Sequence, residues 1–317
     1  MELRTDLHTH TLYSRHAYST IEENVRAACA QNHELLGVTD HFSAMLFPDY
    51  MESKHYQYFY NMNCLPRQWY GVRLLRGCEA DIVDLEGNLF GHDIDAEKGV
   101  IDKNISEADS LYGRVTRKLD YIIASVHNKD FTDNASKSRI TDMYIKALSN
   151  SKVIILGHIG RSGLDFDIDS VVKAARDMHK LIEINEHSFG WDDTIYDRCK
   201  QILVRCAQLG APICVSTDAH VSYDVGRFDN VVKLLESVDT ALCFASAAMS
   251  PVTVYEISTF PFHGYRCCAV TPVIVGVANA ATPIRVNKPV PNAFFIFIAH
   301  RFTMTATGIA NPPTHNR

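Results

Sequence analysis

Short runs of apolar and β-branched residues alternate with amphipathic segments over the first 243 residues of the chain. This alternation is typical of βαβ units, in which helices connect parallel strands. Because the strand and helix patterns recur together, we expect one α/β domain shaped like a barrel, with helices outside its strands. The seven predicted strands cover residues 3–8, 35–39, 72–78, 121–126, 153–156, 181–184 and 213–216.

The segments between these strands have features of helices. Ser19 or Thr20 can cap a helix whose first turn holds Glu22 and Glu23, where acidic side chains interact favourably with the helix dipole. In a later segment, apolar residues recur at helical spacing, namely Val171, Val172, Ala175 and Met178.

The composition changes near Phe244. The residues before it hold 62 charged side chains and three prolines, whereas the last 74 residues hold six charged side chains and eight prolines. No helical or strand periodicity persists in this last part. We therefore predict a domain at residues 1–243, followed by an irregular tail at 244–317. The tail is either an authentic appendage or an aberrant, frame-shifted terminus.

The overall charge and apolar content narrow the function classes. The formal net charge is −6 and the pI is about 6.2, which argues against a broad basic surface for nucleic acid or an anionic membrane. No apolar run approaches the ~20 residues of a membrane-spanning helix, and the N-terminus lacks the pattern of a secretory signal. We expect a cytoplasmic protein that does not bind membranes. The sequence does not indicate its oligomeric state.

Histidine, aspartate or glutamate follows six of the seven predicted strands. One such motif, His8-x-His10, is weak evidence by itself, because it can equally be a histidine pair without a metal. Repetition at six strand ends favours a metal site, because the carboxyl ends of parallel strands in a barrel meet on one face. The residues at these ends are His8 and His10, Asp40 and His41, Glu79, His127, His158, and Asp218 and His220.

The residue types indicate which metals to expect. Imidazoles with a few carboxylates and no cysteine suit Zn, Mn or Fe better than Ca or Mg, which prefer oxygen ligands. The set has more ligands than one ion can use, so a multinuclear site is predicted. Paired metals about 3.5–4 Å apart are typical of enzymes that hydrolyse phosphoesters.

Six segments resemble the PHP (polymerase and histidinol phosphatase) superfamily, and in particular its YcdX-type phosphatase branch. In chain order they read DLHTHTLYSRHAYSTIEENVRAA, GVTDHF, LRGCEADI, IIASVH, ILGHIG and VSTDAH. The resemblance runs from about residue 3 to residue 240. It implies a distorted (β/α)7 barrel with a trinuclear, usually zinc, site at the carboxyl ends of the strands. Manganese or iron are alternatives to zinc.

The resemblance also implies how the ligands divide among three metals. His8, His10 and Asp218 would hold the first metal. His127 and His158 would hold the second, with Glu79 bridging these two metals. The third would be bound by His16, His41 and His220.

Two further residues are candidates for the chemistry. Asp40 either orients the adjacent His41 ring or caps the following turn. Arg161 follows His158 in GHIGR, where relatives commonly have proline directly after the histidine. It either contacts phosphate or is an ordinary surface arginine.

These features predict a phosphoric monoester hydrolase that cleaves small phosphomonoesters by a metal-activated hydroxide. One alternative is a histidinol-phosphate phosphatase. Another is an inactive binding or regulatory module, or a misfolded product, if the tail occupies the place of a closing strand and prevents barrel closure. The net acidity of the chain argues against a nuclease, so the expected partner is a small phosphorylated substrate.

Overall fold

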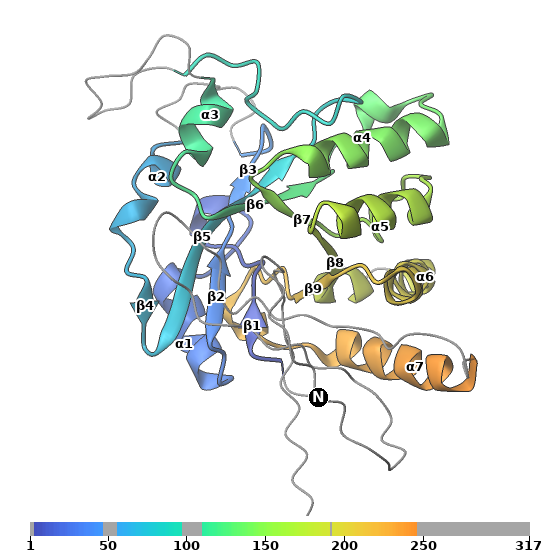
Figure 1. Cartoon of the computed structure of the whole chain (residues 1–317). Coiled ribbons are helices and arrows are strands. Elements are labelled where there is room, and N and C mark those ends of the chain that lie inside the picture. The colour runs from blue at the N-terminus through green and yellow to red at the C-terminus, as the bar shows by residue number, and fades with distance from the viewer. Residues whose placement is uncertain (1–2, 47–55, 97–109, 191, 246–317) are drawn as a thin grey trace, which may run out of the picture.

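The computed structural model describes residues 3–46, 56–96, 110–190 and 192–245. Its strands form one mostly parallel sheet that curls toward a barrel, and α4, α5, α6 and α7 are stacked along its outside (Figure 1). The strand order β1-β2-β5-β6-β7-β8-β9 follows the order of the chain. All seven predicted strands are present on this path, so the predicted (β/α)7 architecture is confirmed.

The described elements have the following bounds. The strands are β1 Thr5–Asp6, β2 Leu35–Val38, β3 His41–Phe42, β4 Gln68–Trp69, β5 Val72–Asp81, β6 Tyr121–Ser125, β7 Val153–Leu156, β8 Leu181–Asn185 and β9 Ile213–Ser216. The α-helices are α1 Ile21–Ala30, α2 Gln57–Tyr60, α3 Leu111–Thr116, α4 Lys137–Ser149, α5 Ile168–Asp177, α6 Asp193–Leu209 and α7 Asp229–Ala245. The described 3-10 turns include η1 Leu12–Ser14, η5 Glu186–Gly190 and η6 Ser222–Asp224.

The first and last strands of the path meet through contacts between residues of the described part of the chain. Thr9 forms a parallel bridge with Ala219, and the His10 amide donates to the Ala219 carbonyl at 2.9 Å. The buried Asp6 carboxylate adds side-chain contacts, because it accepts hydrogen bonds from the amides of Thr217 and Gly226 at 3.0 and 3.1 Å. The described residues therefore bring the two edges of the barrel together.

The barrel is distorted where two neighbouring strand pairs are short or irregular. The register between β6 and β7 shifts at Ile122 and Ile123, and β7 pairs with β8 through only two residue pairs. By contrast, β5 pairs with β6 over five residues, as far as Asp81 and Ser125. The sheet is therefore most regular around β5.

Alternation along the strands separates the barrel interior from the outer core. Part of the barrel interior is filled by a small apolar cluster of Leu7, Leu35, Tyr121, Ile123, Ile155, Leu181 and Cys214. Gly37 is required beside it, because a Cβ there would lie 2.0 Å from the Tyr121 hydroxyl. Since Leu181 lies inside, Glu183 two residues later also faces the interior.

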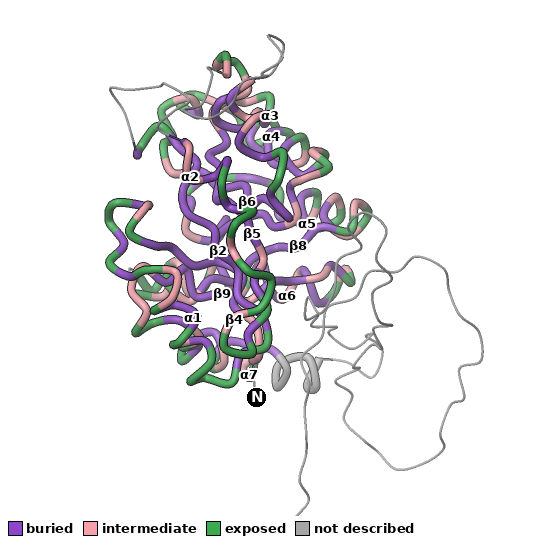
Figure 2. The backbone as a smooth tube through the Cα atoms, turned by 90° about the vertical axis from the view of Figure 1, so that its left-hand side faces the viewer, coloured by how far each residue is buried: buried purple, intermediate pink, exposed green. Residues whose placement is uncertain are grey.

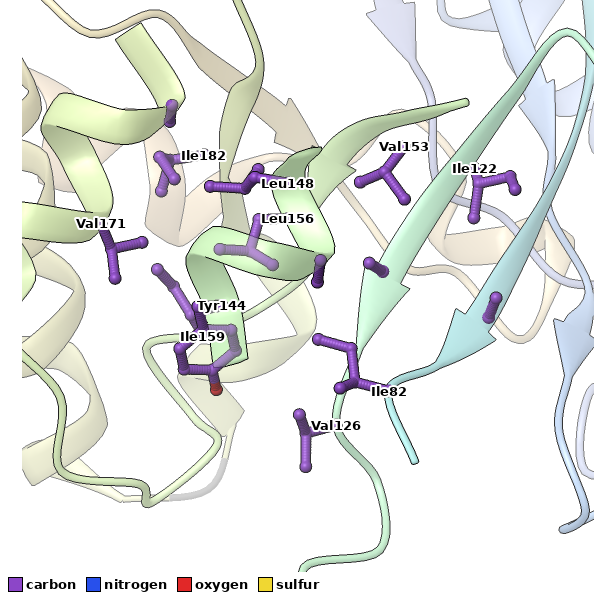
Figure 3. Close-up of a cluster of buried hydrophobic side chains, with 14 of the residues drawn as sticks. Ile82, Ile122, Val126, Tyr144, Leu148, Val153, Leu156, Ile159, Val171 and Ile182 are labelled. Atoms are coloured by element: carbon purple, nitrogen blue, oxygen red, sulfur yellow. The ribbon is translucent and has the colours of Figure 1, made fainter. Parts of the chain in front are cut away.

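A larger apolar core lies between the sheet and the helices. Figure 2 shows the buried backbone concentrated along the strands, with exposed residues on the outer turns of the helices. In Figure 3, Tyr144 and Leu148 of α4 and Val171 of α5 pack near Leu156 and Ile182 of the sheet. This packing holds the strands in place and so fixes where their carboxyl ends lie.

Local sequence signals explain where helices begin. Thr20 caps α1, and Glu23 completes a capping box by accepting from the Thr20 amide. In α5, Val171, Val172 and Ala175 are buried as their spacing predicts.

The helix α7 extends to Ala245, two residues past the predicted domain boundary, and the rest of the predicted tail lies outside the described residues. Within the described part of the chain, no helix is long and apolar enough to span a bilayer.

Candidate metal centre

The carboxyl ends of six strands place the predicted ligands around one point. His8, His127 and His158 each lie two residues beyond the end of a strand, which is β1, β6 and β7 respectively. Glu79 is inside β5 rather than after it, because that strand continues to Asp81. The remaining predicted ligands come from the segments after β1, β2 and β9, namely His10, His16, His41, Asp218 and His220.

The imidazole rings of these segments pack against one another. The ring centroids of His10 lie 4.3 Å from those of both His41 and His220. The His127 ring lies 5.0 Å from His41 and 5.2 Å from His158. All nine predicted ligands therefore belong to a single continuous cluster, which we call the histidine pocket.

His16 is the outermost member of this pocket. It is exposed, and its Nε2 atom lies 3.2 Å from His41 Nε2 and 3.0 Å from His220 Nε2. Three nitrogen atoms in this arrangement can face one cation. The resemblance assigned these three histidines to a third metal.

Several buried atoms of the pocket have no hydrogen-bond partner among the described residues. They are Nε2 of His8 and His10, Nδ1 of His41, Oε2 of Glu79 and Oδ1 of Asp218. Each such atom costs about 1–3 kcal/mol when it is left unsatisfied in a protein interior. The atoms also lie close together, since His41 Nδ1 is 2.8 Å from Glu79 Oε2 and His10 Nε2 is 3.0 Å from Asp218 Oδ1. Cations bound between them would satisfy all five, so the residues present fit a metal centre.

Glu79 lies between two groups of histidines. Its Oε1 atom is 2.7 Å from His158 Nε2 and 3.4 Å from His127 Nε2. Its Oε2 atom faces His41 and lies 3.3 Å from His8 Nε2. The two oxygens of this carboxylate can therefore serve two different cations.

Both pocket carboxylates are held in the ionised form. Burial alone raises the pKa of a carboxyl group, but the imidazoles of His127 and His8 bring the pKa of Glu79 well below its usual value. The pKa of Asp218 is likewise well below its usual value, because His8 and Arg161 outweigh the effect of burial. Ionised carboxylates are the form that binds cations.

Side chains behind the pocket fix the orientation of the imidazoles. Glu183 Oε1 lies 2.8 Å from His8 Nδ1, Asp81 Oδ1 lies 2.6 Å from His127 Nδ1, and Ser14 Oγ lies 3.0 Å from His10 Nδ1. With Nδ1 engaged, the Nε2 atom of each ring is left for a cation. Sequence reasoning missed these three residues. Spacing could have indicated two of them, because Glu183 and Asp81 each lie two residues from a position on the same strand that faces the barrel interior.

The expectation that Asp40 orients the ring of His41 differs from the contacts found. The Asp40 carboxylate accepts from the Thr11 amide at 2.7 Å, from Ser14 Oγ at 2.6 Å and from the Tyr58 hydroxyl at 2.6 Å. Through Ser14 it supports His10 rather than the His41 ring. These donors surround the buried Asp40 carboxylate and take up its hydrogen bonds, so the carboxylate does not contact the His41 ring.

Arg161 faces the pocket from within the fold and is not an ordinary surface arginine. Its guanidinium donates to Asp218 Oδ2 at 2.6 Å and to Asn185 Oδ1 at 3.0 Å, and its side chain is only 17% exposed. Its hydrogen-bonding groups are thus directed at a predicted ligand, which leaves Asp218 Oδ1 for a cation. The contacts favour a positioning role over direct contact with phosphate.

One more histidine borders the pocket. His187 lies in η5 after β8, and its ring centroid is 5.7 Å from that of His220. With Thr217, Ala219, Tyr223 and neighbouring residues it lines a cavity of about 190 Å³. The strand β8, whose end carried no predicted ligand, is therefore also followed by a histidine.

Comparisons with known proteins show which family the chain resembles. The model of the PHP domain family matches residues 6–190. A Clostridium acetobutylicum protein named "Probable phosphatase" is 38% identical over 240 residues, which cover 75% of this chain and 88% of that protein. An Aliivibrio fischeri protein of the same name is 34% identical over 244 residues, or 76% of this chain and 88% of that protein. The crystal structure of histidinol phosphate phosphatase from Lactococcus lactis with zinc, L-histidinol and phosphate has a TM-score of 0.47 and 17% identity, covering 74% of this chain and 93% of that one.

Proposed function

Because the chain belongs to the PHP domain family, we propose that it is a metal-dependent phosphatase that hydrolyses small phosphomonoesters. The observation that carries this proposal is the group of five buried ligand atoms without hydrogen-bond partners in the histidine pocket. We propose zinc as the metal, with manganese or iron as alternatives, because imidazoles dominate the ligand set.

The nine ligands divide into the three sets that the resemblance implies. Three ions bound to these sets would supply the positive charge that activates a water molecule and neutralises phosphate oxygens. Support for the division comes from Glu79, whose two oxygens face different histidines, and from the short contacts of His16 with His41 and His220.

The remaining polar residues keep the ligands in position. Glu183 and Asp81 hold His8 and His127 with Nε2 available, and Arg161 holds one oxygen of Asp218. The backbone adds to this constraint, because His158 and Asp218 both have positive φ angles, 28° and 57°. Such conformations persist only where the surrounding structure imposes them.

The burial of the pocket indicates where a substrate enters. His8, His10, Glu79 and Asp218 are buried, whereas His16 is exposed and His220 is partly exposed. Phosphate would therefore approach over His16 and His220 and meet the cations that the buried ligands hold.

The test combines metal analysis with a phosphatase screen of the purified chain, with and without a chelator. The screen includes histidinol phosphate, the substrate of the alternative assignment. We expect two to three transition-metal ions per chain and a turnover that the chelator abolishes and added zinc or manganese restores. At most one tightly bound ion after reconstitution, or turnover that survives metal removal, would contradict the proposal.

A matched pair of histidine variants separates the pocket from general effects of substitution. His158→Ala and His179→Ala both replace a histidine at positive φ, at 28° and 56°. His179 is exposed and precedes β8, at the opposite end of the barrel from the pocket. Only His158→Ala is expected to lose metal and turnover.

A further inference from the structure

Exposed apolar side chains gather at the carboxyl end of the barrel. Among the described residues, five large apolar side chains are strongly exposed, and four of them lie in the segments after β1, β2 and β9 that also carry predicted ligands. The fifth, Tyr70, lies between β4 and β5 at the opposite end of the barrel. We call these four residues the apolar rim: Leu12, Tyr18, Met45 and Tyr223, which are 56%, 74%, 43% and 68% exposed.

Hydrogen bonds connect the rim to the entrance of the histidine pocket. The Tyr18 amide donates to the carbonyl of His220 at 2.7 Å, and the Leu12 amide donates to the carbonyl of Ser19 at 2.9 Å. Ser19 Oγ in turn accepts from the Ser222 amide at 2.7 Å. The loops that bear Leu12, Tyr18 and Tyr223 are thus fixed against one another beside His220.

Two further contacts fix the segments that bear Met45 and Tyr223. Arg15, next to His16, donates from Nη1 to the Leu46 carbonyl at 2.7 Å, which joins this loop to the segment after β3 that bears Met45. At Tyr223, the Arg227 guanidinium lies 4.0 Å from the centroid of the aromatic ring. That contact restrains the Tyr223 ring in its exposed position.

A concentration of exposed apolar side chains is typical of a binding surface. A permanently bound protein would cover His16 and His220, which form the exposed edge of the pocket, and would block entry of substrate. The occupant must therefore arrive and leave together with the phosphate. The group that does so is the alcohol to which the phosphate is esterified.

We propose that the apolar rim is the leaving-group subsite and that it selects phosphomonoesters of apolar, ring-bearing alcohols over those of small alcohols. This inference rests on the proposed phosphatase function. The histidine pocket would bind the phosphate, and the tyrosine rings of the rim would contact the ring of the alcohol. Aromatic contacts of this kind add about 0.5–1.5 kcal/mol beyond the burial of apolar area, so the expected preference is about tenfold.

The test measures binding separately from turnover. Calorimetry of the zinc-loaded full chain with 2-phenylethylphosphonate and with propylphosphonate compares a ring-bearing and a small ligand that cannot be hydrolysed. The expected result is that the phenylethyl compound binds about tenfold more tightly. Tyr18→Ser and Tyr223→Ser are each expected to reduce this ratio about threefold. Tyr70→Ser, the matched control, keeps the ratio of the unmodified chain.

Equal affinities for the two phosphonates, no binding of either, or a ratio that responds equally to Tyr70→Ser would overturn the inference. Turnover of the two corresponding phosphate esters is measured in parallel, because both leaving groups are primary alcohols. Preferential phosphonate binding without turnover would refute the phosphatase function and leave the subsite standing. Turnover without a binding preference would refute the leaving-group subsite and leave the phosphatase function standing.

Discussion

Glu183 Oε1 lies 2.8 Å from Nδ1 of His8, and both side chains are buried in the barrel interior. The other oxygen of the same carboxylate accepts from the His158 amide at 2.6 Å. A glutamate on β8 thus positions proposed ligands that follow β1 and β7. Carboxylate–imidazole pairs of this kind orient the ring and raise the basicity of the nitrogen that binds a metal.

Glu183→Gln should weaken metal binding by about 10- to 100-fold, because an amide supports the His8 ring less well than a carboxylate does. Competition with a chromophoric chelator measures the affinity. Glu186→Gln is the control, since Glu186 accepts from the amides of Asn230 and Val231 at the start of α7. That variant should lower the melting temperature while leaving metal affinity unchanged. Unchanged affinity in Glu183→Gln would show that the contact with His8 is only structural.

Glu79→Gln should reduce kcat/KM by more than about a hundredfold, because a neutral amide cannot replace a carboxylate that bridges two cations. Steady-state kinetics at saturating metal give the comparison. Glu86→Gln serves as the control, because Glu86 is exposed and pairs with Lys146. If Glu79→Gln kept most of its turnover, the bridging role would be wrong.

Removal of metal should destabilise the fold as well as stop turnover. Cations would satisfy the five buried, unpartnered atoms of the histidine pocket. Ligand that is present at a hundred times its Kd stabilises the native state by about 2.7 kcal/mol, so we expect a clear drop in Tm on chelation, measured by differential scanning calorimetry. Re-addition of zinc should restore the Tm. Identical Tm values with and without metal would contradict a preformed site.

Asp6→Ala tests the closure of the barrel. This substitution leaves the amides of Thr217 and Gly226 without their acceptor, and each unsatisfied buried donor costs about 1–3 kcal/mol. Urea unfolding should therefore show a loss of about 2–6 kcal/mol. Asp177→Ala, which removes an exposed carboxylate paired with Arg176, is expected to change stability by less than about 0.5 kcal/mol. Equal losses in both variants would show that Asp6 does not join the barrel edges.

Truncation after Ala245 should leave metal content and turnover unchanged, because all nine proposed ligands precede that residue. We also expect better solubility, since the removed part includes the apolar run at residues 293–299. Metal analysis and kinetics of the truncated chain provide the measurement. A folded, metal-loaded truncated chain without activity would show that residues 246–317 contribute to the site.

Much of the fold follows from short-range patterns. The seven strands of the main path could be predicted because apolar, β-branched runs recur between amphipathic segments. The two-residue strands β3 and β4 were not predicted, since pairs such as Gln68–Trp69 carry no periodicity. The end of β5 was also placed too early. Pairing with β6 extends that strand through Glu79 to Asp81, which polar residue types alone do not indicate.

The sequence by itself determined which residues come together in the histidine pocket, because histidines and carboxylates at the carboxyl ends of parallel strands must meet on one face. Only the tertiary structure decided how those residues are supported. The contacts of Glu183 with His8 and of Arg161 with Asp218 join residues 175 and 57 positions apart in the chain. Such contacts depend on which strands lie side by side and on the rotamers that packing permits. Local sequence patterns do not encode either property.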